Sequence, residues 1–294
     1  MGQPDLTAYI QDEKKDTTTP SDFIPKVQDS NYYGDALKDS NVNEIIGDEI
    51  PHVIILVGFP EYGKSTFVAS LYHKILTEGK IGQYKFIDSD TLVGFERRAL
   101  IRKYEIQVNE RVDRTPIYAG YFLSLLFEHE ETKEKTKIVI SDRSGETYRS
   151  YTNHEAEIKS DKALQFASHI VFFLDATKIA SENFYDTKDE LRHLVTRMYN
   201  CGVFNTNKII DLVYNKIDCI TEDNKETFNS NKAQIEDIIS KRTRISGTFE
   251  ISSKHAITNI DLNNYFKHLI EVVQREQEIS DEAQQKLNWI NNVI

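Results

Sequence analysis

One loop constrains this chain more than any other feature. It reads Gly58-Phe59-Pro60-Glu61-Tyr62-Gly63-Lys64-Ser65 and fits the pattern G-x-x-x-x-G-K-S. A continuous run rich in β-branched residues precedes it at 52–58, and an amphipathic stretch follows it at 65–78. This context predicts a strand buried on both faces, a tight turn and a helix, which together begin a parallel α/β fold.

The residue types of this loop suit phosphate groups. Its glycines let backbone N–H groups converge on phosphate oxygens at the start of a helix. Lys64 would reach the β- and γ-phosphates, and Ser65 would ligate Mg²⁺. The loop therefore predicts a nucleotide, but it leaves the base and the phosphoryl acceptor open, because kinases, ATPases and GTPases all use it.

Strand-like and helical stretches alternate along the rest of the chain. The strand-like runs lie at 121–128, 137–141, 169–175, 209–214 and 248–251. A charged turn at 130–136 joins the first two and predicts a hairpin. We therefore expect a three-layer α/β fold, in which helices cover both faces of a mostly parallel sheet with one antiparallel edge hairpin.

Composition divides the chain into three parts. Residues 1–50 hold eleven acidic residues and four lysines, so we expect an acidic, largely flexible segment with a short helix near 35–46. Residues 51–275 form the expected nucleotide-binding domain, with an insertion at about 80–114. Residues 276–294 are expected to form a C-terminal helix.

The overall charge narrows the range of partners. There are 36 Lys and Arg against 47 Asp and Glu, a formal charge of −11, which argues against nucleic acid as a partner. No apolar run approaches the roughly 18 residues of a membrane span, so no integral membrane segment is expected. Cys201 and Cys219 cannot build a disulfide framework, and we expect a cytoplasmic protein.

Three later segments narrow the identity of the nucleotide that the chain binds. The strand at 138–141 runs into Asp142-Arg143-Ser144-Gly145, a D-x-x-G motif. A carboxylate at this position can hold Mg²⁺ through water, and the glycine N–H can sense a γ-phosphate. The motif is weak alone but useful after a buried strand.

The other two segments suit a guanine base. Asn215-Lys216-Ile217-Asp218 follows the strand at 209–214, and Asp218 could accept hydrogen bonds from guanine N1 and N2. Asn215 would brace the loop, and the stem of Lys216 would cover the base. The last strand ends in Ile251-Ser252-Ser253-Lys254, which could offer a backbone N–H to guanine O6 while Lys254 packs on the other face of the ring.

These four elements, in this order on successive strand ends, resemble a Ras-like P-loop GTPase of the TRAFAC class. The resemblance covers roughly 51–255 and implies a Ras-like G domain, a three-layer P-loop NTPase that binds GTP or GDP and Mg²⁺. It puts the metal ligands on Ser65, Thr115 and Asp142. It puts the nucleotide contacts on Gly58, Pro60, Glu61, Tyr62, Gly63, Lys64, Ser65, Thr66, Gly145, Asn215, Lys216, Asp218, Ser253 and Lys254.

The switch-I threonine follows a long insertion. Thr115 lies 50 positions after Ser65 and just before the strand at 121–128, where a switch-I threonine belongs; Thr91 is the alternative. The segments 90–98, 114–116 and 144–146 look like the bacterial double-GTPase type. That resemblance implies conflict or defence gene clusters and a protein partner.

Hydrolysis is the open part of this interpretation. Ras-like enzymes place Gln after D-x-x-G to orient the attacking water, and here that position is Glu146. A carboxylate can accept a proton but lacks an amide N–H, so slow hydrolysis is expected; Glu146 could also be a simple helix-start carboxylate. Arg111, Arg114 and Arg143 are candidate arginine fingers or solvated surface charges, and Arg114 joins Lys64, Thr115 and Glu146 as the expected catalytic set.

The sequence thus favours a GTP-binding switch with slow Mg²⁺-dependent hydrolysis, a GTPase that acts with a protein partner. A non-hydrolysing GTP-binding adaptor or regulatory subunit in a bacterial defence-type complex is the alternative, and Pro60 and Glu146 favour it. A phosphotransferase is disfavoured by the segment 215–218.

Overall fold

Eight strands form one sheet in the computed structural model, which describes residues 34–38, 52–108, 121–204, 208–254 and 259–277. These residues all belong to one unit, Tyr33–Ile294. Across the sheet the strands are β2 (Lys80–Ile81), β3 (Tyr84–Asp88), β4 (Phe122–His129), β5 (Lys135–Ser141), β1 (His52–Val57), β6 (His169–Asp175), β7 (Ile209–Asn215) and β8 (Gly247–Ile251).

The sheet is parallel on one side and antiparallel on the other. From β5 through β1, β6 and β7 to β8, each neighbouring pair is parallel. The pairs β2–β3, β3–β4 and β4–β5 are antiparallel. The expected α/β class, mostly parallel with an antiparallel edge, is confirmed. The hairpin of β2 and β3, which extends this edge inside the insertion, was not expected.

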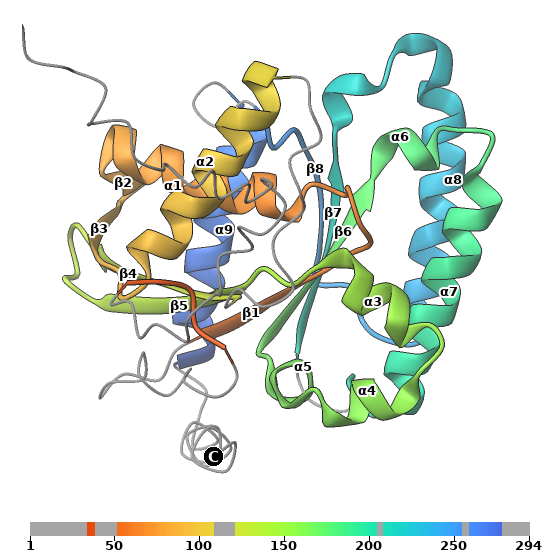
Figure 1. Ribbon diagram of the computed structural model, residues 1–294, viewed down its shortest axis with the longest axis horizontal. Coiled ribbons are helices and arrows are strands. Elements are labelled where there is room, and N and C mark those ends of the chain that lie inside the picture. Colours follow the sequence, from red (N-terminus) through yellow and green to blue (C-terminus); the bar gives the residue numbers. More distant parts are fainter. Residues whose placement is uncertain (1–33, 39–51, 109–120, 205–207, 255–258, 278–294) are drawn as a thin grey trace, which may run out of the picture. The chain divides into compact units, whose positions relative to one another are not determined.

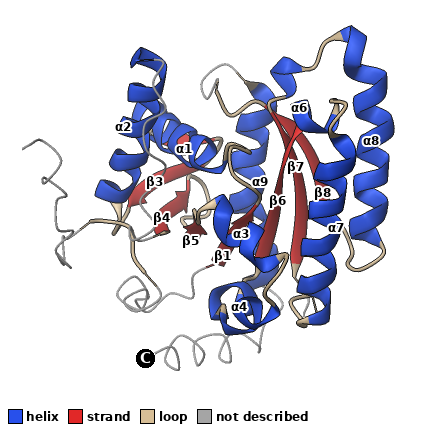
Figure 2. Cartoon of the chain, turned by 45° about the vertical axis from the view of Figure 1, so that its right-hand side comes forward, coloured by secondary structure: helices blue, strands red, loops and turns tan. Residues whose placement is uncertain are grey.

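Helices cover both faces of this sheet (Figures 1 and 2). They are α1 (Lys64–Glu78), α2 (Leu92–Val108), α3 (Gly145–Tyr151), α4 (Glu155–Ser160), α5 (Lys162–Phe166), α6 (Ala176–Ile179), α7 (Phe184–Asn200), α8 (Glu222–Ser240) and α9 (Ile260–Gln277), with a short 3-10 helix at Ile217–Cys219. Figure 2 shows α1 and α9 on one face and α3, α7 and α8 on the other.

The core lies along the central strands. Every residue of β1 and β6 is buried, which explains why their sequences are continuous apolar runs rather than alternating ones. Phe67 of α1 contacts Phe173 of β6 and Tyr265 and Phe266 of α9, with ring centroids 5.0, 5.8 and 5.1 Å apart. These aromatic contacts hold α1 and α9 on the same face of the sheet.

The insertion packs its helix α2 on α1. The rings of Tyr72 and Phe95 stack with centroids 5.4 Å apart, and the Tyr72 hydroxyl donates to Glu96 at 2.6 Å. The N-terminal segment 34–38 lies against the same helix, so closely that a Cβ on Gly94 would come within 2.6 Å of the Ala36 nitrogen. Leu37 forms an isolated antiparallel bridge with Phe122 of β4, within the stretch 35–46 where a helix was expected. Residues 39–46 lie outside the described residues.

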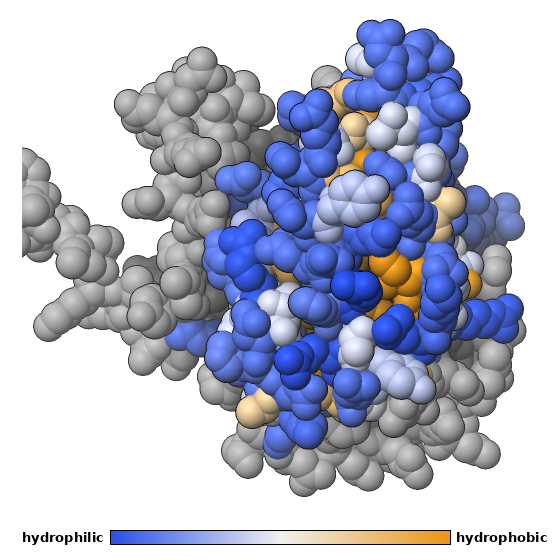
Figure 3. All heavy atoms as spheres, turned by 90° about the vertical axis from the view of Figure 1, so that its right-hand side faces the viewer, coloured by the Kyte–Doolittle hydropathy of each residue, from blue (hydrophilic) through white to orange (hydrophobic). Residues whose placement is uncertain are grey.

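The side of the molecule formed by α7 and α8 presents mainly hydrophilic residues, interrupted by a small hydrophobic area (Figure 3). Among the helices of the described ranges, none is long and apolar enough to cross a membrane. Of the expected C-terminal helix at 276–294, residues 276–277 end α9 and residues 278–294 lie outside the described residues.

Candidate functional site

The phosphate loop has the local geometry that its sequence predicts. It connects β1 to α1, and Gly63 takes a left-handed backbone conformation, with φ of 89°, just before the helix begins at Lys64. A side chain at Gly63 would also collide with the Asn215 amide, since a Cβ would lie 2.1 Å from its nitrogen. Glycine is therefore required here for two separate reasons.

Lys64 is buried and folds back on its own loop. Its Nζ donates to the carbonyl oxygens of Gly58 at 2.5 Å and Phe59 at 3.3 Å. Burial lowers the pKa of Lys64 to about 8, although the nearby charges of Asp142 and Glu146 act in the opposite direction. A buried ammonium whose hydrogen-bond acceptors are neutral carbonyl groups can gain from an anion placed beside the loop.

Asp142 is the meeting point of three elements. It directly follows β5 with 2% of its surface exposed, and its Oδ1 accepts a hydrogen bond from Ser65 Oγ at 3.0 Å. Its Oδ2 accepts from Arg98 Nε of α2 at 2.8 Å. Arg98 is also buried and donates to the Gly94 carbonyl at 2.9 Å, so the insertion is tied to the D-x-x-G motif.

The pair of Ser65 and Asp142 suits a magnesium ion. A hydroxyl and a carboxylate oxygen only 3.0 Å apart offer the hard oxygen donors that Mg²⁺ prefers. The third expected ligand, Thr115, lies outside the described residues, as do Arg111 and Arg114. Thr91, the alternative to Thr115, is fully buried, and its Oγ1 accepts from the Ser124 N–H of β4 at 2.8 Å.

Gly145 brings the D-x-x-G motif against the phosphate loop. A Cβ there would lie 2.2 Å from the Pro60 nitrogen, so the two loops approach too closely for any side chain. Gly145 begins α3, and Ser144 caps that helix by accepting from the Glu146 N–H at 3.3 Å. The Glu146 carboxylate accepts from Arg149 Nη1 at 3.3 Å.

Asn215 joins three loops with one buried side chain. Its Nδ2 donates to the Tyr62 carbonyl of the phosphate loop at 2.9 Å. Its Oδ1 accepts from the Ser253 N–H at 3.0 Å and from the Ser253 hydroxyl at 2.9 Å. These three hydrogen bonds tie the three loops to one buried side chain and hold their relative positions.

Three more residues belong to the guanine-type motifs. Lys216 takes a left-handed conformation, with φ of 65°, and its Nζ pairs with Asp175 Oδ2 at 2.6 Å. Asp218 and Lys254 are exposed. The buried residues of these motifs therefore hold the loops together, and the exposed ones remain accessible to a ligand.

Arg143 is neither a finger nor a surface charge, and that expectation is corrected. It is buried and forms an ion pair with Asp161, and it donates to Tyr121 Oη at 3.1 Å. Its guanidinium lies 4.4 Å from the centre of the Tyr121 ring. Arg143 follows Asp142 directly, and because successive residues of extended backbone point to opposite sides, one faces the phosphate loop and the other the packing beneath α3.

Sequence reasoning missed Arg98. The segment 90–98 resembles a family pattern. The sequence of a helix alone, however, does not identify Asp142, 44 positions away, as the partner of Arg98. Gly94, four residues before Arg98, lets the segment 34–38 approach α2. This spacing of glycine and arginine does not by itself indicate that Arg98 is buried.

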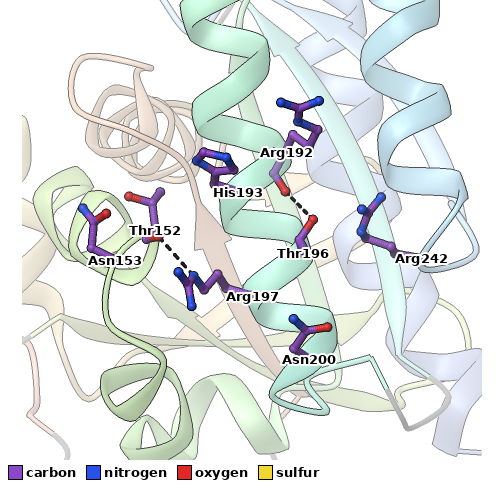
Figure 4. Close-up of a pocket in the computed structure, with 8 residues that line it drawn as sticks. All are labelled: Thr152, Asn153, Arg192, His193, Thr196, Arg197, Asn200 and Arg242. Carbon is purple, nitrogen blue, oxygen red and sulfur yellow. Dashed lines mark hydrogen bonds between the residues drawn. The ribbon is translucent and has the colours of Figure 1, made fainter.

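A separate cavity of about 460 Å³ lies beside α7 (Figure 4). It is lined by Thr152, Asn153, Arg192, His193, Thr196, Arg197, Asn200 and Arg242. Arg197 spans it, donating to the Thr152 carbonyl at 3.2 Å and pairing with Glu155 at 2.8 Å. None of these residues belongs to the phosphate or base motifs, so this cavity is distinct from the candidate site.

Comparison with known proteins agrees with this geometry. A family model described as Double-GTPase 2 matches residues 52–273. A comparison with curated proteins finds no match.

Several solved structures also match. A bacterial selenocysteine-specific elongation factor, EF-Sec, is 14% identical with a TM-score of 0.40, over 78% of this chain and 29% of that one. A putative nucleolar GTP-binding protein 1 from Plasmodium falciparum is 19% identical with a TM-score of 0.43, over 85% of this chain and 100% of that one. Elongation factor SelB from Methanococcus maripaludis, in complex with the GTP analogue GppNHp, is 15% identical with a TM-score of 0.39, over 76% of this chain and 34% of that one. The chain therefore spans under a third of EF-Sec and about a third of SelB.

Proposed function

Because the chain belongs to the Double-GTPase 2 family, we propose that it is a molecular switch with slow, Mg²⁺-dependent hydrolysis of GTP to GDP and phosphate. Asn215 carries this proposal. Its side chain links the phosphate loop at Tyr62 to the 251–254 loop at Ser253, which supports one continuous site for phosphates and base.

Guanine selectivity rests on Asp218. A carboxylate accepts but does not donate, so it matches the N1–H and N2–H groups that guanine presents and adenine does not. Lys216 and Lys254 would cover the two faces of the base with their aliphatic stems. The Ser253 N–H already donates to Asn215 Oδ1, so Ser253 supports the base loop through that bond.

The phosphates would lie against the loop from Gly58 to Thr66. Lys64 would exchange its two carbonyl acceptors for phosphate oxygens, which restores a full charge partner to a buried ammonium. Ser65, Asp142 and Thr115 would hold Mg²⁺, which supplies positive charge beside the β- and γ-phosphates. Thr115 and the 142–145 loop are the segments expected to respond to a γ-phosphate.

Slow GTP hydrolysis is expected because Glu146 would lie beside the γ-phosphate. Glu146 adds negative charge near the phosphates and is held by Arg149, so it is poorly suited to stabilise the developing charge. Arg111 and Arg114 remain as candidates on this chain for a finger, and a protein partner is the other source. We place this action in the cytoplasm, together with a protein partner.

A second candidate function is a GTP-binding adaptor without hydrolysis. The ion pair of Arg98 with Asp142 favours it, because a guanidinium already occupies one oxygen of the carboxylate that should face Mg²⁺. Tight GTP binding without phosphate release would support this alternative.

The deciding experiment measures phosphate release from GTP and from ATP in the presence of Mg²⁺, with Lys64→Ala as control. Release from GTP alone, lost in the variant, would support the switch. Equal release from ATP would overturn the guanine assignment. Binding of GTP without release would favour the adaptor.

A further inference from the structure

A cluster of two histidines and an aspartate lies at the end of the sheet opposite the nucleotide loops. His169 is the first residue of β6, and Asp211 lies near the start of β7, whereas the nucleotide motifs follow the other ends of these strands. His268 reaches the cluster from α9. The cluster therefore joins two central strands to the last described helix.

The three side chains converge on one point. The Nε2 atoms of His169 and His268 lie 2.8 and 2.9 Å from the same Asp211 oxygen, Oδ2. One ligand-type atom from each residue lies within 4.8 Å of the other two. His169 and Asp211 have no exposed side-chain surface, whereas His268 keeps 28% of its side chain exposed.

Hydrogen bonds among the three residues do not satisfy the cluster. The second Asp211 oxygen, Oδ1, and the second His169 nitrogen, Nδ1, are buried and have no hydrogen-bond partner among the described residues. A buried polar atom without a partner destabilises a fold by more than an ordinary hydrogen bond stabilises it. The Oδ1 atom, partnerless within the described ranges, leaves Asp211 one oxygen for a further ligand beside the two imidazoles, whereas His169 Nδ1 is the ring nitrogen that does not face Asp211.

We propose that His169, Asp211 and His268 bind a zinc ion, which fastens α9 to the buried ends of β6 and β7. Two imidazole nitrogens and one carboxylate oxygen are a donor set that Zn²⁺ takes readily, with water completing a four-coordinate site. The exposed part of His268 supplies the route by which the ion enters. Each imidazole offers its Nε2 lone pair, so the proton on that nitrogen moves to Nδ1 or to solvent.

The surroundings hold His268 in place for this role. Its ring stacks on Tyr265 with an interplanar angle of 24° and lies 4.7 Å from the Phe249 ring. The Tyr265 hydroxyl reaches Asp211 Oδ2 at 3.5 Å. A ligand whose rotamer is fixed by packing loses little entropy when it binds a metal.

The test uses the full chain without an affinity tag, stripped with EDTA and returned to buffer containing Mg²⁺. Zn²⁺ is then titrated against a chromophoric chelator, and the melting temperature is recorded with and without zinc. We expect about one tightly bound zinc ion per chain and a higher melting temperature in its presence.

His268→Ala should lose both the tight zinc ion and the zinc-dependent rise in melting temperature. It is partly exposed, so this variant should still fold. His193→Ala, in the cavity beside α7, is the matched control and should keep both. GTP binding should persist in His268→Ala, so this result does not depend on the proposed switch.

Cobalt gives a second readout, because Co²⁺ in a site with two nitrogen donors and few ligands absorbs visible light more strongly than the hydrated ion. Failure to retain zinc, or equal retention by His268→Ala, would overturn the site and leave a hydrogen-bonded triad.

Discussion

Arg98 Nε lies 2.8 Å from Asp142 Oδ2, and Ser65 Oγ lies 3.0 Å from the other oxygen of the same carboxylate. One buried aspartate is thus shared between the phosphate-loop helix and the inserted helix α2. The ion pair of Arg98 and Asp142 therefore connects the insertion to the centre of the candidate site.

Arg98→Ala should destabilise the nucleotide-free protein by about 3–5 kcal/mol, because it leaves the buried Asp142 carboxylate without its charge partner. Added GDP and Mg²⁺ should recover part of this loss, since the metal would supply a replacement charge. Thermal unfolding with and without GDP and Mg²⁺ measures the difference. Arg97→Ala is the control, because Arg97 is half-exposed and pairs with Asp35 instead. An equal loss in both nucleotide states would contradict the shared role of Asp142.

Asn215→Ala should cost about 1–3 kcal/mol of unfolding free energy, because it leaves the Tyr62 carbonyl and the Ser253 N–H without partners. GTP affinity should fall as well, since three loops lose their common brace. Urea unfolding and nucleotide titration are the measurements. Asn231→Ala is matched to it, because Asn231 Nδ2 also donates to a single carbonyl, that of Ile179, but lies outside the site. If both variants bind GTP equally well, the bracing role is wrong.

Asp218→Asn should lower affinity for GTP by a factor on the order of 100 and improve affinity for XTP. Xanthine carries an oxygen where guanine carries its N2 amine, and an Asn amide can donate to that oxygen while a carboxylate cannot. Competition binding with GTP and XTP measures the change in base preference. Asp223→Asn, in the first turn of α8, should change neither affinity. An unchanged preference in Asp218→Asn would move base recognition elsewhere.

Glu146→Gln should change the rate of GTP turnover while leaving GTP affinity within a few-fold. The substitution removes a negative charge near the phosphates and adds an amide N–H that can orient water. Single-turnover phosphate release measures this effect, and Arg149→Ala tests whether the ion pair with Glu146 holds the carboxylate in place. Unchanged turnover in Glu146→Gln would remove Glu146 from the mechanism and leave it as a helix-start carboxylate.

The sequence predicted those parts of the site in which chemistry is local. The phosphate loop, the strand before it and the order of the later motifs each depend on a few adjacent residues, and the observed strands and loops follow them. Arg98 could not be predicted because its partner Asp142 is distant in the chain. The β2–β3 hairpin could not be predicted because β2 is only two residues long and carries no periodic signal. Arg143 was misjudged because a charged residue after a strand is usually solvated, whereas here Asp161 and three tyrosines bury it.

The two outer strands of the sheet disfavour pairing with a strand of another protein. At one edge β2 is only two residues long, and its Lys80 is exposed and paired with Glu130. At the other edge β8 exposes Thr248 and Glu250, and Lys232 crosses to bind Glu250. Short, charged edges discourage the addition of a foreign strand. We therefore expect the proposed protein partner to contact helices and loops, among them the 142–145 loop that the nucleotide would control.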